Sequence, residues 1–320
     1  MNSKPLITII MAIYKPNIIW LQEQLISLNE QDYPCLKLLV WNDCPEDETN
    51  YEVIFSKCIT KFPYKIIRGK KNLGSNGAFE QLTVKADGEY LAYCDQDDIW
   101  HSNKLSVLMD LLLAKNGTLA CSDMAVINGN GDKVAVTIQD VRPRHVFVEG
   151  NSQVEYLITR NFVTGCTMIV KNDIAKKAVP FPAYEEMVHD HWLALWNAIN
   201  GKIVIAKIPL IDYRIHGNNQ TSVLTGITSK KTYYDIRIIP YFKRIAWLLE
   251  KNFPIEIKEM LERRQLWAKA RCEYQKNANA KNFIKVFKGI NFNICATAFE
   301  LAMPFMSNSM FNLLIRWLRK

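Results

Sequence analysis

The stretch Tyr93-Cys94-Asp95-Gln96-Asp97-Asp98-Ile99-Trp100 decides the fold class of this 320-residue chain. A mostly apolar run at residues 89–93 leads into it and predicts a strand, and residues 102–115 after it predict a helix. Three carboxylates therefore crowd the C-terminal end of a strand, which is where open α/β sheets bind their ligands.

Carboxylates this close repel one another unless a cation lies between them. A divalent cation with oxygen ligands, Mg²⁺ or Mn²⁺ holding a diphosphate, would supply that charge. Along extended backbone, Asp95 and Asp97 would point to one side and Asp98 to the other. The alternative is an acidic turn that caps the next helix. The apolar strand before the acids and Trp100 after them favour the cation site.

Strand and helix patterns alternate through the first 115 residues, which predicts a doubly wound, mostly parallel sheet with helices on both faces. Strands are predicted at residues 6–13, 36–41, 64–68 and 89–93, and helices at 18–30, from the acidic residues 46–48 onward, and at 78–86. A glycine-rich loop at residues 71–77 precedes the helix at 78–86.

The pattern changes after residue 115. Asn128-Gly129-Asn130-Gly131-Asp132 separates two apolar runs, 119–127 and 133–137, and predicts a hairpin. Further elements are predicted as strands at 162–170, 202–205 and 208–215 and a helix at 191–200, and residues 228–320 are mostly helical by period.

Charge is divided unevenly along the chain. Residues 228–320 hold 18 Lys and Arg against 7 Asp and Glu, an excess of +11, whereas the first 227 residues hold 22 against 25, or −3. We therefore expect two parts, a catalytic domain at 1–227 and a basic helical region at 228–320. Its apolar and basic end, residues 311–320, is typical of a contact with an anionic membrane surface. A helical cap or a homodimer contact is the alternative.

Several protein classes are excluded on composition. No run of eighteen apolar residues spans a membrane, and residues 1–5 lead into a strand rather than a signal peptide. Eight cysteines without Cys-x-x-Cys spacing indicate reduced thiols in a cytoplasmic protein. Nucleic-acid binding is not expected, because the first 227 residues are net acidic and carry no recognition motif.

Six motifs in a fixed order carry a resemblance to a known family. They are residues 6–14, Asn42-Asp43, Asn72-Leu73-Gly74, residues 95–100, His189-Asp190-His191-Trp192 and residues 213–219. Together they resemble a family 2 glycosyltransferase of the GT-A fold, in its bacterial rhamnosyltransferase-like branch, over about residues 5–225. The acidic segment with its following Ile-Trp is the most specific of the six.

This resemblance implies a metal-dependent inverting transferase. Such an enzyme moves a sugar from a nucleotide-diphosphate donor, dTDP-rhamnose or a UDP-hexose, to a hydroxyl of a saccharide acceptor that is lipid-linked in some pathways. The product belongs to bacterial cell-surface polysaccharide. By resemblance, Asp97 is the main ligand of Mn²⁺ or Mg²⁺, His216 is a second metal or diphosphate contact, and Asp95 faces the ribose or the metal.

The nucleotide is expected at the ends of the first two strands. Asp43 matches the carboxylate that accepts a hydrogen bond from a pyrimidine N3–H in similar enzymes; an Asx turn before Pro45 is the alternative. Gly74 would let backbone approach the nucleotide. The other predicted nucleotide contacts are Ala12, Tyr14, Asn72 and Gln96. Packing of Tyr14 and an ordinary helix-start loop at residues 72–74 remain open.

An inverting transferase needs a general base on the acceptor hydroxyl. Asp190 is the predicted base, with helix capping as the alternative and Glu185 and Glu186 as rivals. The two histidines beside Asp190 lack a third close ligand and do not predict zinc. Arg214 is expected to pair with a phosphate or a carboxylate. The remaining predicted site positions are Asp98, Trp100, Thr164, Gly165, His191 and Trp192.

Two other functions compete with this one. A sugar nucleotidyltransferase usually carries a glycine-rich basic loop after its first strand, and residues 12–17 contain no glycine. A non-catalytic nucleotide-sugar-binding module would not need Asp97, Asp190 and His216 together.

Overall fold

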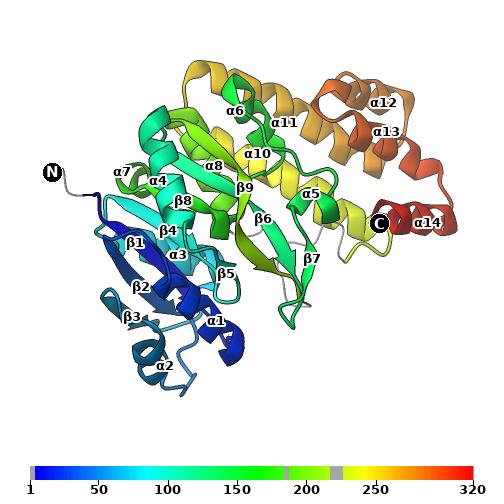
Figure 1. Ribbon diagram of the computed structural model, residues 1–320. Coiled ribbons are helices and arrows are strands. Elements are labelled where there is room, and N and C mark those ends of the chain that lie inside the picture. Colours follow the sequence, from blue (N-terminus) through cyan, green and yellow to red (C-terminus); the bar gives the residue numbers. More distant parts are fainter. Residues whose placement is uncertain (1–3, 184–186, 217–225, 320) are drawn as a thin grey trace. The chain divides into compact units, whose positions relative to one another are not determined.

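The computed structural model describes residues 4–183, 187–216 and 226–319 (Figure 1). The chain forms two compact units, Met1–Asn218 and Asn219–Lys320. All strands of the described residues belong to the first unit. The predicted functional division, with a catalytic part up to residue 227 and a contact region after it, stays a prediction.

One mixed sheet forms the centre of the first unit. Its strands are β1 Ile7–Ile13, β2 Leu36–Asn42, β3 Tyr64–Arg68, β4 Tyr90–Cys94, β5 Ile99–Trp100, β6 Leu119–Ile127, β7 Lys133–Ala135, β8 Met168–Lys171 and β9 Ile203–Arg214. They lie in the order β3-β2-β1-β4-β8-β6-β9-β5, with β7 paired to β6. The first four positions of that order are parallel, and β8 runs antiparallel to both of its neighbours.

Helices cover both faces of this sheet. The helices of the unit are α1 Ile18–Asn29, α2 Tyr51–Cys58, α3 Gly74–Lys85, α4 Lys104–Lys115, α5 Ile138–Val141, α6 Gln153–Thr159, α7 Asn172–Lys177 and α8 His189–Asn200. Alternate residues of β1, from Ile7 to Ile13, pack in one buried cluster with side chains of α1, α2 and α4. On the other face, Phe79 of α3 contacts Tyr93 of β4 and stacks on His189 of α8. The predicted fold class is confirmed.

Several predicted elements were wrong in extent. Residues 203–214 form one strand, β9, rather than two, because a bulge takes up residues 207–208 and keeps Ala206 opposite Ser122 and Pro209 opposite Asp123. The strand predicted at 162–170 is confined to β8, after a 3₁₀ turn at Gly165–Thr167. Helix α2 begins at Tyr51 rather than at the acidic residues 46–48, because the Asn50 side chain caps it.

The second unit is helical in its described residues. It comprises α9 Lys230–Tyr233, a π-helical turn Tyr234–Ile238, α10 Ile239–Leu249, α11 Ile255–Lys276, α12 Ala280–Phe287, α13 Ile294–Ala302 and α14 Asn308–Arg319. A buried ion pair joins Arg271 of α11 to Glu300 of α13 at 2.6 Å, and the Tyr233 hydroxyl donates to Glu300 at 3.0 Å. This pairing fixes α9, α11 and α13 against one another. No described helix is long and apolar enough to cross a bilayer.

Candidate active site

The acidic cluster, which we define as Asp95, Asp97 and Asp98, follows the C-terminal end of β4. Strand β1 pairs in parallel with β4 on one side and with β2 on the other, so the C-terminal ends of all three strands reach the same edge of the sheet. The side chains do not alternate as predicted. Carboxylate oxygens of Asp95 and Asp98 and the Cys166 sulfur all lie within 4.8 Å of one another, whereas Asp97 turns to His216. The reason is that residues 95–98 lie outside the strands, with a bend at residues 96–97.

Burial raises the pKa values of two carboxyl groups of this cluster, Asp95 and Asp98. Asp98 is fully buried, and Oδ1 accepts a hydrogen bond from the Arg214 backbone N–H at 2.9 Å. Desolvation, with Asp97 and Asp95 nearby, raises the pKa of Asp98 well above its usual range. Desolvation and Asp97 raise the pKa of Asp95 to about 7. The cluster therefore gains from any positive charge placed against it.

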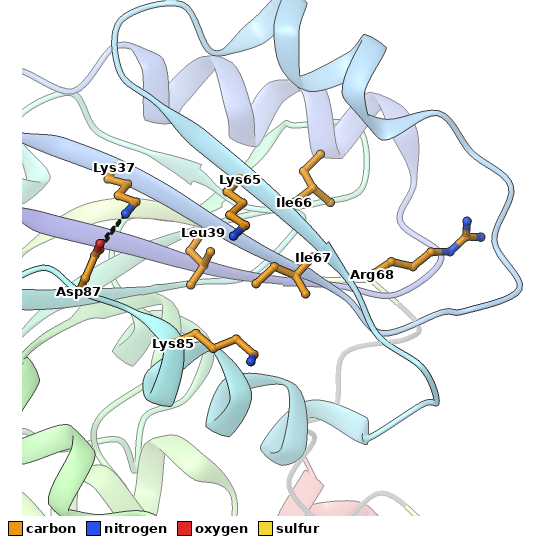
Figure 2. A pocket seen from close by; sticks show the side chains of 8 residues that line it. All are labelled: Lys37, Leu39, Lys65, Ile66, Ile67, Arg68, Lys85 and Asp87. Carbon is orange, nitrogen blue, oxygen red and sulfur yellow. Dashed lines mark hydrogen bonds and ion pairs between the residues drawn. The ribbon is translucent and has the colours of Figure 1, made fainter.

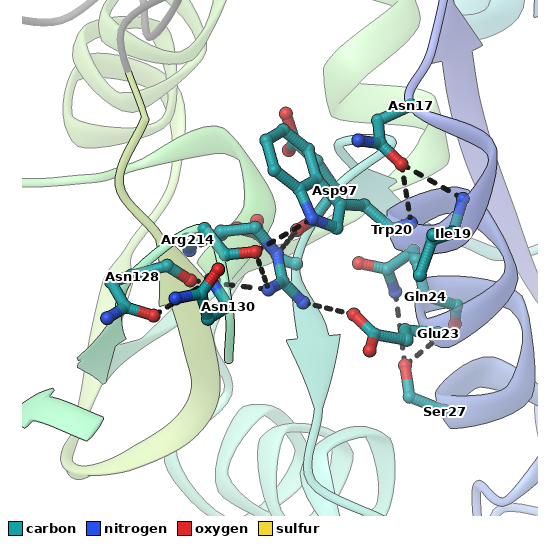
Figure 3. Close-up of polar contacts among 12 residues, drawn as sticks. Asn17, Ile19, Trp20, Glu23, Gln24, Ser27, Asp97, Asn128, Asn130 and Arg214 are labelled. Carbon is teal, nitrogen blue, oxygen red and sulfur yellow. Dashed lines mark hydrogen bonds and ion pairs between the residues drawn. The ribbon is translucent and has the colours of Figure 1, made fainter. Parts of the chain in front are cut away.

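Arg214, at the end of β9, is buried and holds the loop of the acidic cluster (Figure 3). Its Nε donates to the Asp97 carbonyl at 2.8 Å, and Nη2 pairs with Glu23 of α1 at 2.5 Å. Its Nη1 donates to the Asn128 carbonyl in the β6–β7 turn at 3.3 Å. Of the two partners predicted for Arg214, phosphate or carboxylate, the described contacts show the carboxylate.

His216 and Asp97 form the second polar contact of the cluster. The His216 Nε2 lies 2.9 Å from Asp97 Oδ2, and its ring packs at 4.9 Å from that of Trp20 on α1. The Trp20 indole in turn donates to the Gly129 carbonyl at 3.0 Å. The structure therefore brings together the two residues predicted to bind a metal, although 119 positions separate them in the chain.

The end of β1 is linked to the acidic segment by a pair of reciprocal hydrogen bonds. The Tyr14 N–H donates to Gln96 Oε1 at 2.8 Å, and Gln96 Nε2 donates to the Tyr14 carbonyl at 3.3 Å. The Tyr14 side chain is 44 % exposed and Ala12 is half-buried. These predicted nucleotide contacts thus border one open surface beside the acidic cluster.

Asp43 is buried and accepts hydrogen bonds from the start of α3. The backbone N–H groups of Leu73 and Gly74 donate to its carboxylate at 2.9 to 3.0 Å. The Asx turn before Pro45 is made by Asn42 instead, which accepts from the Cys44 N–H at 3.0 Å. Gly74 has a φ of +68°, so glycine suits this helix start. Asn72 Oδ1 accepts from the same Gly74 N–H at 2.8 Å.

Asp190 is the second residue of α8, so it is not the cap of that helix. Its Oδ2 accepts from the Gly165 N–H at 3.0 Å, and Oδ1 accepts from the Asn161 side chain at 3.1 Å. Burial raises the pKa of Asp190 to about 6. Its charge acts on Asp95, which indicates that the predicted base lies close to the acidic cluster. The rivals Glu185 and Glu186 lie outside the described residues.

Comparisons with known proteins show the family of this chain. The family model described as "Glycosyl transferase family 2" matches residues 8–176, more than half of the chain. The chain belongs to glycosyl transferase family 2.

Curated relatives and solved structures are similar at low sequence identity. The glucosyltransferase WfgD of Escherichia coli, named as using UDP-Glc and a GlcNAc-diphosphoundecaprenol acceptor, is 25 % identical over 60 % of this chain and 72 % of its own. The dTDP-rhamnosyl transferase RfbG of Shigella flexneri is 24 % identical over 66 % and 73 %. Residues 1–349 of TarS from S. aureus with UDP-GlcNAc superpose with a TM-score of 0.59 at 16 % identity, covering 90 % of this chain and 80 % of that one. This similarity confirms the predicted glycosyltransferase fold.

Several predicted site residues of this glycosyltransferase pack in its interior. The His191 ring nitrogen lies 2.5 Å from the Leu157 carbonyl, and the Trp192 indole donates to the Ala178 carbonyl at 2.7 Å. Trp100 is buried, and the Thr164 carbonyl accepts from the Thr167 N–H at 2.9 Å. We assign His191, Trp192 and Trp100 to packing, whereas the half-buried Thr164 stays a predicted site residue. Gly165 differs, because its N–H contacts Asp190 and a Cβ there would lie 3.1 Å from His189 Nε2.

The sequence reasoning missed several residues that hold the site. Asn76 of α3 accepts from the His189 N–H at 2.8 Å and donates to the Met187 carbonyl at 2.8 Å, which fixes the start of α8. Asn161 supports Asp190, and Glu23 holds Arg214. Lys104 is fully buried beside the acidic cluster. A single buried polar residue outside the site motifs produces no periodic pattern in the sequence. The only available signal was the presence of asparagine side chains near those motifs.

A groove at the edge of the sheet is separate from this site (Figure 2). It measures about 710 Å³ and is lined by Lys37, Leu39, Lys65, Ile66, Ile67, Arg68, Lys85 and Asp87. The Lys37–Asp87 ion pair at 2.6 Å lies at one end of it. None of the predicted site residues lines this groove, so the acidic cluster remains the candidate active site.

Proposed function

We propose that this family 2 glycosyltransferase is a metal-dependent inverting enzyme. It moves a sugar from a nucleotide-diphosphate donor, dTDP-rhamnose or a UDP-hexose, to a hydroxyl of a saccharide acceptor. The observation that carries the proposal is the juxtaposition of a buried carboxylate with a raised pKa, Asp190, and the acidic cluster at the sheet edge. The nucleotide sugars named for WfgD, RfbG and TarS support a donor of this class.

The residues at the cluster fit a hard divalent cation. They offer carboxylate oxygens of Asp95, Asp97 and Asp98 and the imidazole of His216, a donor set suited to Mn²⁺ or Mg²⁺. One buried oxygen, Asp98 Oδ2, has no hydrogen-bond partner among the described residues. When bound, the cation would act as a Lewis acid on the diphosphate. A solved mannosyltransferase of Pyrobaculum calidifontis contains GDP-Man and Mn²⁺.

Asp190 is the proposed general base of the reaction. The Gly165 N–H and the Asn161 amide hold its carboxylate in one orientation, which favours a proton transfer at a fixed place. A pKa of about 6 leaves the carboxylate ionised at neutral pH and still basic enough to take a proton as the acceptor oxygen attacks.

The nucleotide is proposed to bind along the edge made by Ala12, Tyr14 and Gln96 on one side and Asn72 and Gly74 on the other. Asp43 already accepts hydrogen bonds from the start of α3. We therefore propose two roles for Asp43. It accepts a hydrogen bond from a pyrimidine N3–H, and it holds the segment of Asn72 and Gly74 in place.

A panel of nucleotide sugars tests the function. With Mn²⁺ present, the correct donor at a hundred times its dissociation constant is expected to stabilise the protein by about 2.7 kcal/mol in a thermal-shift measurement. Slow release of the nucleoside diphosphate should accompany it. Release of pyrophosphate from a nucleoside triphosphate and a sugar phosphate would indicate a nucleotidyltransferase instead, and stabilisation without turnover would indicate a binding module.

The second unit is proposed to hold the enzyme at an anionic membrane surface near a lipid-linked acceptor. Besides the excess of +11 in residues 228–320, α14 buries Phe311 and Ile315 and exposes Leu313 (70 %) and Trp317 (66 %). Each Lys or Arg near such a surface contributes about 1 kcal/mol to membrane binding. Burial of the Leu313 and Trp317 side chains in the bilayer adds a contribution that salt does not screen. The GlcNAc-diphosphoundecaprenol acceptor of WfgD is of this kind.

We therefore expect the full chain to float with anionic vesicles, and high salt to weaken this binding without abolishing it. Replacing Leu313 and Trp317 with serine should remove most of the salt-resistant part. The matched control replaces two exposed valines of the first unit, Val134 and Val136, with serine. Flotation of the double variant equal to that of the wild type, or no flotation of either protein, would leave the second unit as a structural cap or an oligomer contact.

A further inference from the structure

Lys104 occupies an unusual position for a lysine. It is the first residue of α4 and is fully buried. A buried ammonium group is costly, and the start of a helix disfavours positive charge. Something nearby must offset both effects, because an isolated lysine would not persist there.

The direct contacts of the Lys104 ammonium are neutral. Its Nζ donates a hydrogen bond to the Cys166 carbonyl at 2.5 Å and lies 3.2 Å from the centroid of the Trp100 ring. A carbonyl dipole and an aromatic face both attract a cation, but neither carries a net charge. These contacts fix where the ammonium lies and leave its charge to be balanced by other groups.

The acidic cluster supplies part of that balance. Desolvation lowers the pKa of Lys104 to about 7, while Cys166, Cys94, Asp98 and Asp95 act in the opposite direction, which favours the charged form. Cys166 connects the two sides, because its sulfur lies within 4.8 Å of both carboxylates while its carbonyl accepts from Lys104. Asp98 also leaves Oδ2 buried without a hydrogen-bond partner among the described residues.

We propose that Lys104 is a built-in cation behind the acidic cluster, whose charge lowers the cluster's affinity for a free divalent cation. Part of the negative charge is then already neutralised. A free cation therefore binds weakly. A diphosphate that binds together with the cation adds negative charge and so restores the attraction that Lys104 removes. This last step rests on the proposed function, whereas the effect on the free cation does not.

A purely structural lysine would behave differently. If Lys104 only tied α4 to the Gly165–Thr167 turn, its loss would loosen the cluster and weaken cation binding. If its charge matters, the loss of that charge strengthens cation binding. The two roles therefore predict opposite signs for the same measurement.

The first experiment is a titration of the protein with Mn²⁺ alone, without donor or acceptor. For Lys104→Met, which keeps an unbranched side chain without charge, we expect the Mn²⁺ dissociation constant to fall on the order of tenfold, as the loss of one nearby unit charge predicts. Lys115→Met, at the exposed end of the same helix, is the control and should leave the constant unchanged. A constant that stays the same or rises in Lys104→Met overturns the proposal.

A double-mutant cycle covers the case in which Lys104→Met folds poorly. Asp98→Asn removes one of the charges that Lys104 balances, so the double variant Asp98→Asn with Lys104→Met should have a higher melting temperature than Lys104→Met alone. Strictly additive losses of stability in the two single variants would contradict the proposal. Neither experiment uses transfer activity, so a wrong assignment of the donor or of the reaction would not alter either result.

Discussion

Replacing Asp190 with asparagine is expected to slow sugar transfer by about 10²–10⁴-fold, the usual range for the loss of a general base. Asparagine keeps the size of the side chain and can still accept a hydrogen bond from the Gly165 N–H, which Asp190 accepts at 3.0 Å. It cannot take a proton from the acceptor hydroxyl. Because Asp190 belongs to α8 and not to the edge proposed for the nucleotide, donor affinity should hardly change.

Steady-state transfer and donor titration, measured on the same preparations, separate the two effects. Asp173→Asn, on the exposed surface of α7, is the matched control and should behave as the wild type. If Asp190→Asn transfers sugar at a near wild-type rate while donor binding collapses, Asp190 is a binding residue, and Glu185 and Glu186 become the candidates for the base.

Acid should inactivate the wild-type enzyme through the same group. The pKa of the Asp190 carboxyl is about 6, so the ionised base is present above pH 6 and is lost as the pH falls below it. We expect the transfer rate to drop about tenfold per pH unit below that value, because only the ionised fraction can act as base. The residual transfer rate of Asp190→Asn should not show this decrease at low pH. A decrease that persists in the variant would mean that another group causes it.

Folding stability should fall as the pH rises, whereas the transfer rate rises. The pKa of Asp190 is raised on folding from 3.8 to about 6, so the protonated form favours the fold and ionisation costs on the order of 3 kcal/mol of unfolding free energy. This loss develops as pH rises from about 4 to 6. The melting temperature of Asp190→Asn relative to wild type should therefore increase between pH 5 and pH 8, and a constant difference would contradict the raised pKa.

The sequence predicted those parts of the fold that depend on local pattern. Continuous apolar runs such as residues 6–13 identify buried parallel strands, and the Asn-Gly repeats at 128–132 identify the hairpin of β6 and β7. Ordered motifs identified the family. Each of these signals is contained in a stretch of about ten residues, which is why a single sequence is enough to read them.

Side-chain geometry of the acidic cluster could not be predicted in the same way. The alternation rule placed Asp98 opposite Asp95, but a bend at residues 96–97 brings the two carboxylates together. What holds that bend is the N–H and guanidinium of Arg214, more than a hundred positions later. No local pattern encodes a contact of this range.

The burial of Lys104 shows the same limit. Lysine at the start of a predicted helix normally lies at the surface, and nothing in residues 102–115 marks it as buried. Its environment is made by Trp100 beside it and by Cys166, 62 positions away. Only the packed structure shows that this lysine is buried and bonded to the Cys166 carbonyl beside the acidic cluster.

The Asp97→Ala variant is expected to lose transfer by about 10³-fold or more, because a Lewis-acid metal contributes several kcal/mol to stabilising developing charge. The fold should persist. The Asp97 carboxylate is partly exposed and bonds to His216, whereas the bond that anchors the loop runs from Arg214 Nε to the backbone carbonyl of Asp97 and survives the substitution.

Three measurements on the Asp97→Ala variant follow from this separation of side chain and backbone. Its melting temperature without metal should stay close to that of the wild type, the stabilisation by donor with Mn²⁺ should disappear, and transfer should vanish. Asp173→Ala on α7 serves as the control, since its carboxylate lies 3.9 Å from the Lys171 ammonium at the surface and should affect none of the three. Full transfer by Asp97→Ala in the presence of a chelator would remove the metal from the mechanism, and Asp190 would then have to act without a cation on the diphosphate.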